Sequence, residues 1–317
     1  MSLDLAAIRT AHERIRPHIV RTPVLRSDWL DAACGGQLWF KCENLQHVGA
    51  FKARGATNAI FALSSADAAR GVATHSSGNH AAAVARAARL RGIPAFIVMP
   101  SNSARTKVAN VERLCGRITF CEPTTVAREA ACARILAETG AALIHPYNDH
   151  QVMAGQGTAA VELLEEVANL DLILCPVGGG GLLCGTAVAA KALRPGIRVI
   201  ATEPAGADDA ARSFRAGHIV PADKVATIAD GLRTTIGAKN FPLIQQHVDD
   251  VVTVSEAGIL AAMRRLWDEL KIIVEPSAAV PFAAIQENKL SVTGRRVGII
   301  LSGGNVDIAD LPPGFFG

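Results

Sequence analysis

Short apolar runs rich in β-branched residues alternate along this chain with Ala-rich stretches of helical length. The run at 72–75, for example, is followed by a polar loop and then by a helical stretch over 79–91 that ends at Gly92. A chain that alternates strands and helices in this way buries a mostly parallel sheet between helices. The alternation therefore predicts an α/β fold.

The same reasoning predicts further strands at 95–99, 117–121, 143–145, 171–176, 198–202 and 296–301. A helix expected over 257–270 carries an apolar stripe, which we interpret as core. The stripe consists of Ile259, Leu260, Met263, Leu266, Trp267 and Leu270.

Length and composition limit the function classes. The 317 residues suggest two domains, and 50% hydrophobic with 19% charged residues argues against disorder. No run of about 18 apolar residues is present, so we expect no membrane association. The net charge of +3 comes from scattered basic residues, which makes nucleic acid an unexpected partner.

The amphipathic segment 1–9 does not resemble a secretory signal, and we expect a cytoplasmic protein. Seven cysteines occur without any Cys-x-x-Cys pair. We therefore expect reduced, mostly buried thiols rather than disulfides or a zinc ribbon.

Four consecutive glycines, residues 178–181, lie between the apolar run 172–177 and the helical stretch 182–193. Four residues without Cβ atoms cost conformational entropy, and a tight turn needs only one or two of them. Backbone N–H groups in such a loop can surround an anion, and the following helix adds the positive end of its dipole. We expect a phosphate here rather than a plain turn.

The spacing of this glycine run argues against two nucleotide motifs. A Walker loop requires Gly-Lys-Ser/Thr five residues after its first glycine, where this chain has Leu183 and Cys184. The dinucleotide fingerprint requires a glycine at one of the same two positions. A cofactor with a single phosphate is the remaining expectation.

Lys52 lies beside Phe51 in the otherwise small and apolar segment 48–56. A lysine removed from water loses part of its preference for the charged form and becomes a usable nucleophile. An ordinary solvated lysine is the alternative. Polar loops at 76–80 and 302–305 also follow expected strands, where open parallel sheets bind ligands.

These motifs, in this order, resemble those of the fold-type II pyridoxal phosphate enzymes, and within them the serine/threonine dehydratase and serine racemase branch. The resemblance extends from Arg-Thr-Pro at 21–23 to Ser-Gly-Gly-Asn at 302–305. It implies a tryptophan synthase β-like fold of two domains, each a mostly parallel, open twisted sheet flanked by helices. The large cofactor-binding domain would comprise 1–70 and 149–317, and the small substrate-side domain 71–148.

The resemblance also implies roles for single residues. Lys52 would hold pyridoxal 5'-phosphate as a Schiff base and then remove the α-proton of the substrate, while Phe51 packs against the ring. Asn79 would donate to the ring hydroxyl oxygen, and Ser302 would face the pyridine nitrogen. A hydroxyl does not keep that nitrogen protonated, which weakens the electron sink and suits β-elimination. The phosphate would be bound by the amides of Gly178, Gly179, Gly180 and Gly181.

Ser77 would supply a second catalytic hydroxyl, on the cofactor face opposite Lys52. Two acid/base groups on opposite faces permit racemisation, although relatives that mainly dehydrate also have a serine here. By the same resemblance, substrate contacts are expected from Ser76, His80, Arg128 and Thr234. For the last three, a surface or packing role is the alternative.

The loop 203–209 resembles the divalent-cation loop of this branch. Glu203, the backbone carbonyl of Ala207, and Asp209 would bind Mg²⁺ or Ca²⁺ through oxygen atoms, which suit a hard ion. An acidic surface turn is the alternative interpretation.

The chain departs from the usual motifs at the pocket wall. Ala50 replaces a frequent serine, and Ala81 with Ala82 replaces a frequent Gly-Gln pair. Tyr147, the only tyrosine, stands where some racemases have an asparagine, which favours a dehydratase. These departures leave the side-chain preference for the substrate open.

The resemblance therefore implies an ammonia-lyase (dehydratase) that removes water and ammonia from a 3-hydroxy amino acid to give a 2-oxo acid. Serine, threonine, 3-hydroxyaspartate and 3-phenylserine are the candidate substrates, and Arg128 is a candidate for binding a second carboxylate. An amino acid racemase on the same scaffold is the alternative, followed by sulfur-transfer β-replacement and a non-catalytic binding protein. Relatives are usually homodimers, so a homodimer is expected.

Overall fold

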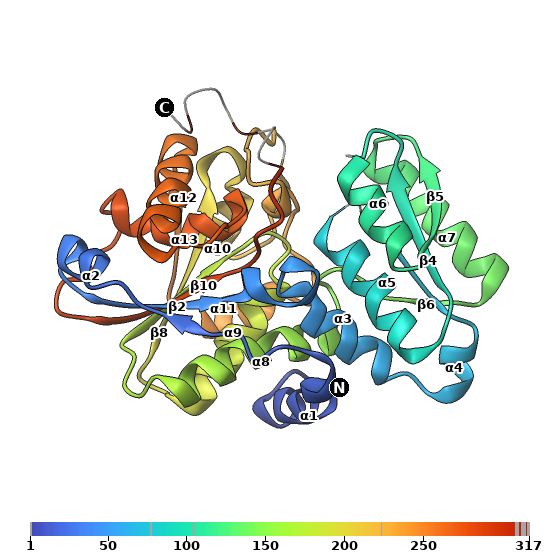
Figure 1. Cartoon of the computed structure of the whole chain (residues 1–317), viewed down its shortest axis with the longest axis horizontal. Coiled ribbons are helices and arrows are strands. Elements are labelled where there is room, and N and C mark those ends of the chain that lie inside the picture. Colours follow the sequence, from blue (N-terminus) through green and yellow to red (C-terminus); the bar gives the residue numbers. More distant parts are fainter. Residues whose placement is uncertain are drawn as a thin grey trace.

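The computed structural model describes residues 2–76, 78–103, 105–222, 224–307, 311 and 315, apart from the side chains of Thr106 and Thr125. The chain forms two lobes that lie side by side, each built on its own sheet (Figure 1). Helices flank both sheets, which confirms the predicted α/β fold.

The larger lobe contains a six-stranded sheet, counted over the described residues, in the order β1-β2-β10-β7-β8-β9. Neighbouring strands are parallel except for the antiparallel pair β1 and β2. The strands are β1 (Val24–Leu25), β2 (Gln37–Cys42), β7 (Leu172–Pro176), β8 (Arg198–Pro204), β9 (Asp250–Val254) and β10 (Arg296–Leu301).

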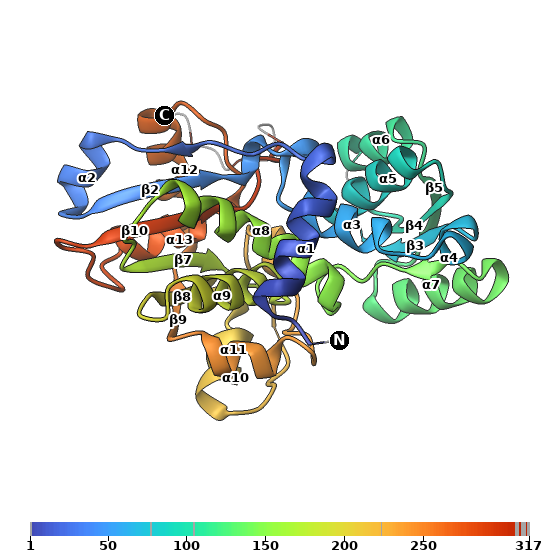
Figure 2. The ribbon, with the colours of Figure 1, turned by 90° about the horizontal axis from the view of Figure 1, so that it is seen from below.

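Helices cover both faces of this sheet. Alternate side chains of β7 enter two different apolar cores, Ile173 and Cys175 one and Leu172 and Leu174 the other. Burial on both faces is typical of parallel sheets. On the first face, part of which Figure 2 shows, lie α1 (Leu5–Ile15), α8 (His150–Glu166), α9 (Gly181–Leu193), α10 (Asp209–Ala216) and α11 (Phe241–His247). On the second lie α2 (Asp28–Cys34), α12 (Glu256–Leu270) and α13 (Pro276–Gln286).

The smaller lobe contains a parallel sheet in the order β5-β4-β3-β6. Its strands are β3 (Val72–His75), β4 (Ala95–Pro100), β5 (Arg117–Cys121) and β6 (Ala142–Leu143). Its helices are α4 (Ser65–Ala69), α5 (Asn79–Arg91), α6 (Arg105–Arg113) and α7 (Thr125–Thr139). Short 3₁₀ turns elsewhere are η1 (Arg16–His18), η2 (Glu43–Leu45), η3 (His47–Gly49), η4 (Ala205–Ala207) and η5 (Asp230–Leu232).

Helix α3 (Lys52–Phe61) connects the two lobes. It packs against α5 of the smaller lobe and against α8 of the larger one. Ala56 and Ile60 of α3 are buried in the same core as the alanine-rich face of α5. The first residue of α3, Lys52, therefore lies at the boundary between the lobes.

Most predicted elements are confirmed, including α5 with its end at Gly92 in the left-handed conformation. The strand predicted at 143–145 is wrong, because β6 ends at Leu143. The carbonyl of Ile144 accepts from Thr74 Oγ1 (2.8 Å) and from His80 Nε2 (2.9 Å), so side chains occupy the position of a further ladder bond. Strands β1, β2 and β9 were not predicted.

The core position predicted for the apolar stripe of α12 is confirmed. In the stripe of α12, four residues are buried and Leu260 and Trp267 pack against the same core. All seven cysteines are free thiols, and four of them are buried. Within the described residues, we find no helix whose length and apolarity would allow it to span a bilayer.

Candidate active site

A cavity of about 590 Å³ lies between the two lobes, at the carboxyl ends of strands from both sheets. This volume is within the range of small-molecule sites. The predicted cofactor and substrate residues that the structure describes all line this cavity. They are Phe51, Lys52, Ser76, Asn79, His80, Arg128, Gly178, Gly179, Gly180, Gly181, Thr234 and Ser302. Ser77 lies outside the described residues.

Lys52 projects from the start of α3, next to the ring of Phe51. Its Nζ donates a hydrogen bond to the carbonyl oxygen of Pro146 at 2.7 Å and lies 5.0 Å from the centre of the Phe51 ring. Burial lowers the pKa of Lys52 to about 8, although the charge of Glu275 opposes the shift. A substantial fraction of the amine is therefore neutral near physiological pH, as a nucleophile or a base requires.

The glycine run follows β7 and leads into α9. Gly180, in a left-handed conformation with φ of 93°, is the N-cap of this helix. A Cβ on Gly179 would lie 2.3 Å from Cγ of Tyr147, and one on Gly178 would lie 2.9 Å from Cα of Leu232. The backbone of the glycine run thus lies closer to Tyr147 and Leu232 than it could if these positions carried a Cβ atom. The first N–H groups of α9 lack intrahelical partners by geometry and can bind an anion.

The polar loop after β3 contributes Ser76, Asn79 and His80. His80 is buried, and burial followed by the charge of Lys52 holds its pKa well below the usual value. Because a neutral ring must donate from Nε2 to the carbonyl of Ile144, its Nδ1 is an acceptor. Nδ1 has no hydrogen-bond partner in the described part of the chain.

Glu275 is a residue of the cavity wall that the sequence analysis did not identify. It precedes α13, is 3% exposed, and accepts hydrogen bonds from Asn79 Nδ2, 3.0 Å from both of its oxygens. The backbone N–H of Asn305 donates to it at 3.2 Å. Burial raises the pKa of Glu275 to about 7. A glutamate between Val274 and Pro276 in an apolar segment was the available sequence signal.

Two histidines and Tyr147 form another part of the wall. The ring of His145 lies edge-on to those of His75 (5.9 Å between centres) and Tyr147 (4.7 Å). Its Nδ1 accepts from the backbone N–H groups of Tyr147 and Asn148. Burial, followed by the charge of His75, lowers the pKa of His145 to about 4, so this ring is neutral.

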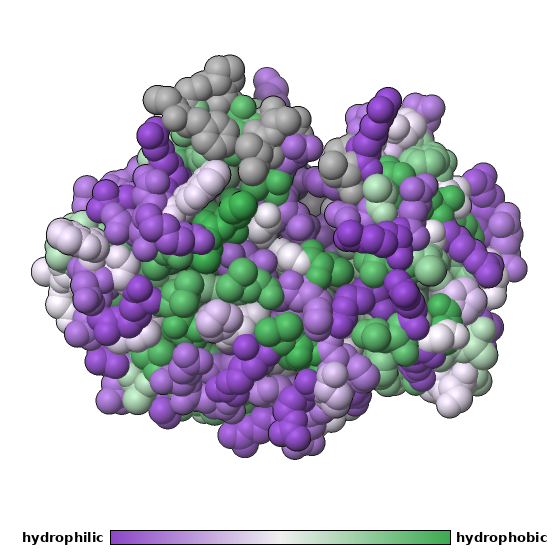
Figure 3. Space-filling model, in the orientation of Figure 1, coloured by the Kyte–Doolittle hydropathy of each residue, from purple (hydrophilic) through white to green (hydrophobic). Residues whose placement is uncertain are grey.

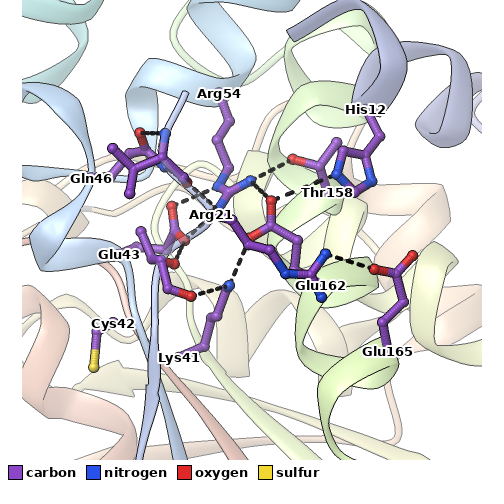
Figure 4. A network of polar contacts seen from close by, with 12 residues as sticks. His12, Arg21, Lys41, Cys42, Glu43, Gln46, Arg54, Thr158, Glu162 and Glu165 are labelled. Atoms are coloured by element: carbon purple, nitrogen blue, oxygen red, sulfur yellow. Dashed lines mark hydrogen bonds and ion pairs between the residues drawn. The ribbon is translucent and has the colours of Figure 1, made fainter. Parts of the chain in front are cut away.

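Behind the start of α3 lies a buried cluster of charges, drawn in Figure 4. Arg54 donates to both oxygens of Glu43 (2.7 and 2.8 Å) and to both oxygens of Glu162 (2.8 Å each). Lys41 donates to Glu162 at 2.6 Å. Burial alone would raise the pKa of Glu162, but the hydrogen bonds and charge of Arg54 and the charge of Lys41 lower it. The cluster fixes α3 to β2 and α8.

The loop predicted to bind a metal follows β8, and its residues are not among those that line the cavity. Glu203 accepts from the backbone N–H groups of Ala210 (3.1 Å) and Ala211 (2.6 Å), and Asp209 accepts from Ile236 (3.2 Å). Burial raises the pKa of Glu203 to about 8 and that of Asp209 to about 6.

Known proteins resemble this chain over nearly its whole length. A family model described as pyridoxal-phosphate dependent enzyme matches residues 15–303. A beta-hydroxyaspartate dehydratase from Paracoccus denitrificans is 52% identical over 95% of this chain and 96% of the relative. A serine racemase from Arabidopsis thaliana is 49% identical over 97% and 95%. The structure of maize serine racemase superposes with a TM-score of 0.96 at 48% identity, covering 98% of this chain and 95% of that one.

Proposed function

The chain belongs to the family of pyridoxal-phosphate dependent enzymes, fold type II, and we propose that it removes water and ammonia from a 3-hydroxy amino acid. One observation carries the proposal: a desolvated lysine and a loop of four glycines face the same cavity. Loss of water from the substrate leaves an enamine, and hydrolysis of the imine that it forms adds water back and releases ammonia and a 2-oxo acid. A panel of 3-hydroxy amino acids, in all stereoisomers, scored for 2-oxo acid formation tests it.

The residues of the cavity fit the cofactor. Lys52 would hold its aldehyde carbon, and the amides of residues 178–181 would bind its phosphate in a cradle that Cβ atoms would fill. Asn79 would contact the ring hydroxyl oxygen, and Ser302 the pyridine nitrogen. When bound, pyridoxal phosphate accepts the electrons released when the substrate loses its α-proton.

The protein's own groups then move the proton. We infer that Lys52 Nζ takes the α-proton, because with a pKa of about 8 a substantial fraction of the amine is neutral at physiological pH and can accept a proton. The carbonyl oxygen of Pro146, 2.7 Å away, can hold the ammonium that results. The hydroxyl of Ser302 carries no negative charge that would keep the pyridine nitrogen protonated.

We propose 3-hydroxyaspartate as the preferred substrate. Support comes from the name of the relative from Paracoccus denitrificans and from Arg128, which lines the cavity and can bind a second carboxylate. Arg128→Ala is expected to raise KM for hydroxyaspartate about ten- to a hundredfold, the value of one hydrogen bond to a charged group. KM for serine should change little.

Arg134→Ala, an exposed change on the same helix, is the control. If Arg128→Ala left the preference among serine, threonine and hydroxyaspartate unchanged, Arg128 would have no role in selecting the substrate.

An amino acid racemase is the second candidate, favoured by the similarity to serine racemases. Racemisation needs a proton donor on each face of the substrate, and Ser77 is proposed as the donor opposite Lys52. A chiral assay of wild type and Ser77→Ala separates the two activities. Loss of racemisation with retained 2-oxo acid formation would assign Ser77 this role.

We also propose that Glu203, the carbonyl of Ala207 and Asp209 bind Mg²⁺ or Ca²⁺. Two neighbouring buried carboxylates with raised pKa values support this, because a cation would offset their burial and repulsion. Thermal unfolding with each ion, for wild type and Glu203→Gln, tests it. Equal midpoints with and without the ions in wild type would remove the proposal.

We also propose the domain boundaries, the cellular location and the oligomeric state of the protein. The division of the strands supports a large domain of 1–70 and 149–317 and a small one of 71–148, because β3 to β6 all lie within 71–148 and the strands of the other sheet lie outside it. Free thiols support a reducing, cytoplasmic location. A homodimer follows from the family resemblance alone, and sedimentation of the purified protein checks it.

A further inference from the structure

Glu275 carries a buried carboxylate whose partners in the cavity wall are amides. Both of its oxygens lie 3.0 Å from Asn79 Nδ2, and one also accepts from the backbone N–H of Asn305. Asn79 begins α5 of the smaller lobe, whereas Glu275 and Asn305 belong to the larger lobe. The contact therefore crosses the cavity boundary between the lobes.

The chemistry of these partners selects one orientation of the Asn79 amide. An ionised carboxylate only accepts, so the nitrogen end of Asn79 must face Glu275. The Asn305 Nδ2 group only donates, and it donates to Asn79 Oδ1 at 2.9 Å and to the carbonyl of Val48 at 2.7 Å. A reversed amide would set oxygen against carboxylate and nitrogen against nitrogen.

We propose that Glu275 is a positioning residue, which fixes the orientation of the Asn79 amide and hence the hydrogen bond that Asn79 offers to the cofactor ring. This inference rests on the proposed function, since the ring is that of pyridoxal phosphate. Glu275 itself takes no proton from the substrate.

Two glycines allow the backbone to lie close to the side chains of Glu275 and Asn305. A Cβ on Gly303 would lie 2.6 Å from Glu275 Oε1, and the backbone N–H of Glu275 donates to the carbonyl of Gly303 at 2.9 Å. A Cβ on Gly49 would lie 2.5 Å from Asn305 Oδ1. Both glycines therefore allow an approach that leaves the two side chains little freedom.

The charge state of Glu275 depends on its surroundings. Burial and the charge of Asp230 raise its pKa to about 7, whereas the hydrogen bonds from Asn79 and Asn305 and the charge of Lys107 lower it. Lys52 is close enough that the charge of Glu275 raises the pKa of its amine. Once protonated, Glu275 can donate as well as accept, and the selection of one amide orientation is lost.

The test uses wild type, Glu275→Gln, Asn79→Ala and the double variant, each freed of cofactor and titrated with pyridoxal 5'-phosphate. The dissociation constant and the visible absorption of the lysine-bound cofactor are measured. We expect Glu275→Gln to weaken binding about ten- to a hundredfold and to shift the absorption band. In the Asn79→Ala background, the same change should alter binding by less than about twofold, because Glu275 acts through Asn79.

Glu256→Gln is the matched control, since Glu256 also accepts from a backbone N–H, that of Ile228, but does not line the cavity. It should leave binding and absorption unchanged. If Glu275→Gln does not fold, Glu275→Asp is used in its place. This variant keeps the charge on a shorter side chain, so we expect smaller changes in the dissociation constant and in the absorption band.

Independent effects of the Glu275 and Asn79 changes, or a Glu275→Gln protein indistinguishable from wild type, would overturn the inference while leaving the proposed function intact. A wild-type protein that forms no absorption band with pyridoxal 5'-phosphate would overturn both.

Discussion

The Nζ atom of Lys52 donates a hydrogen bond to the carbonyl oxygen of Pro146 at 2.7 Å. Lys52 begins α3, whereas Pro146 follows the last strand of the smaller sheet. The bond therefore holds the amine in the boundary between the lobes, facing the cavity that also contains the glycine loop. This relationship underlies the first two predictions.

Replacing Lys52 by alanine should abolish covalent attachment of pyridoxal phosphate and reduce turnover by at least about a hundredfold, because the amine is both the point of attachment and the proposed base. Mass spectrometry after borohydride reduction measures the attachment. Lys289→Ala, which removes an amine from a half-exposed side chain, should retain both. A reduced adduct on Lys52→Ala protein would show that another residue holds the cofactor.

The apoprotein should take up pyridoxal phosphate at a rate that rises with pH and is half-maximal near pH 8. Only the neutral amine attacks the aldehyde, and burial lowers the pKa of Lys52 to about 8 from its usual 10.5. Between these values the unfolded chain binds more protons than the folded one, so this group makes the apoprotein more stable as pH rises through that window. Stopped-flow absorbance measures the rate, and a midpoint near 10.5 would contradict the burial argument.

Gly179→Ala should destabilise the protein by about 1–3 kcal/mol and weaken cofactor binding. The new Cβ would lie 2.3 Å from Cγ of Tyr147, so the glycine loop or the tyrosine must move. Urea unfolding and cofactor titration measure the two effects. Gly196→Ala, where a Cβ meets nothing within 4 Å, is the control.

Tyr147→Ala should restore part of the loss in a Gly179→Ala background, because it removes the clashing ring. If the double variant were no better than Gly179→Ala alone, the close approach to Tyr147 would not explain why a glycine is needed at 179.

The sequence predicted the loops of the site because strand and helix alternate clearly around them. Residues 76–80 and 178–181 each follow an apolar run and precede a helix, which places them at the carboxyl edge of a sheet. Glu275 was missed because its partner Asn79 lies 196 residues away, and only the packing of the two lobes brings them together. No local pattern records such a contact.

Strand β2 was missed for a related reason. Its sequence contains Lys41, which in isolation indicates a solvated position, yet this lysine is fully buried in the structure. Its partner Glu162 lies 121 residues away on α8. The carboxylate of Glu162 compensates the buried charge of Lys41, but the fold has to be known before the two residues can be recognised as partners.

The same pair leads to a prediction on stability. Glu162→Gln should destabilise the protein by about 3–5 kcal/mol, because Lys41 loses the carboxylate to which it donates and Arg54 keeps only one of its two carboxylate partners, Glu43, within a buried cluster. Urea unfolding measures the change. Glu165→Gln is a change on the same helix as Glu162 and breaks only the half-exposed ion pair between Glu165 and Arg21. It should cost less than about 1 kcal/mol.

The pH dependence of the two proteins provides a second measurement of the cluster. The pKa of Glu162 is lowered in the folded state, so its contribution is present above the ordinary value of 4.5 and is lost as pH falls through the lower, folded value. Wild type should therefore lose its advantage over Glu162→Gln on acidification below about pH 4.5. A constant difference over that range, or equal costs for the two variants, would mean that the cluster does not anchor α3.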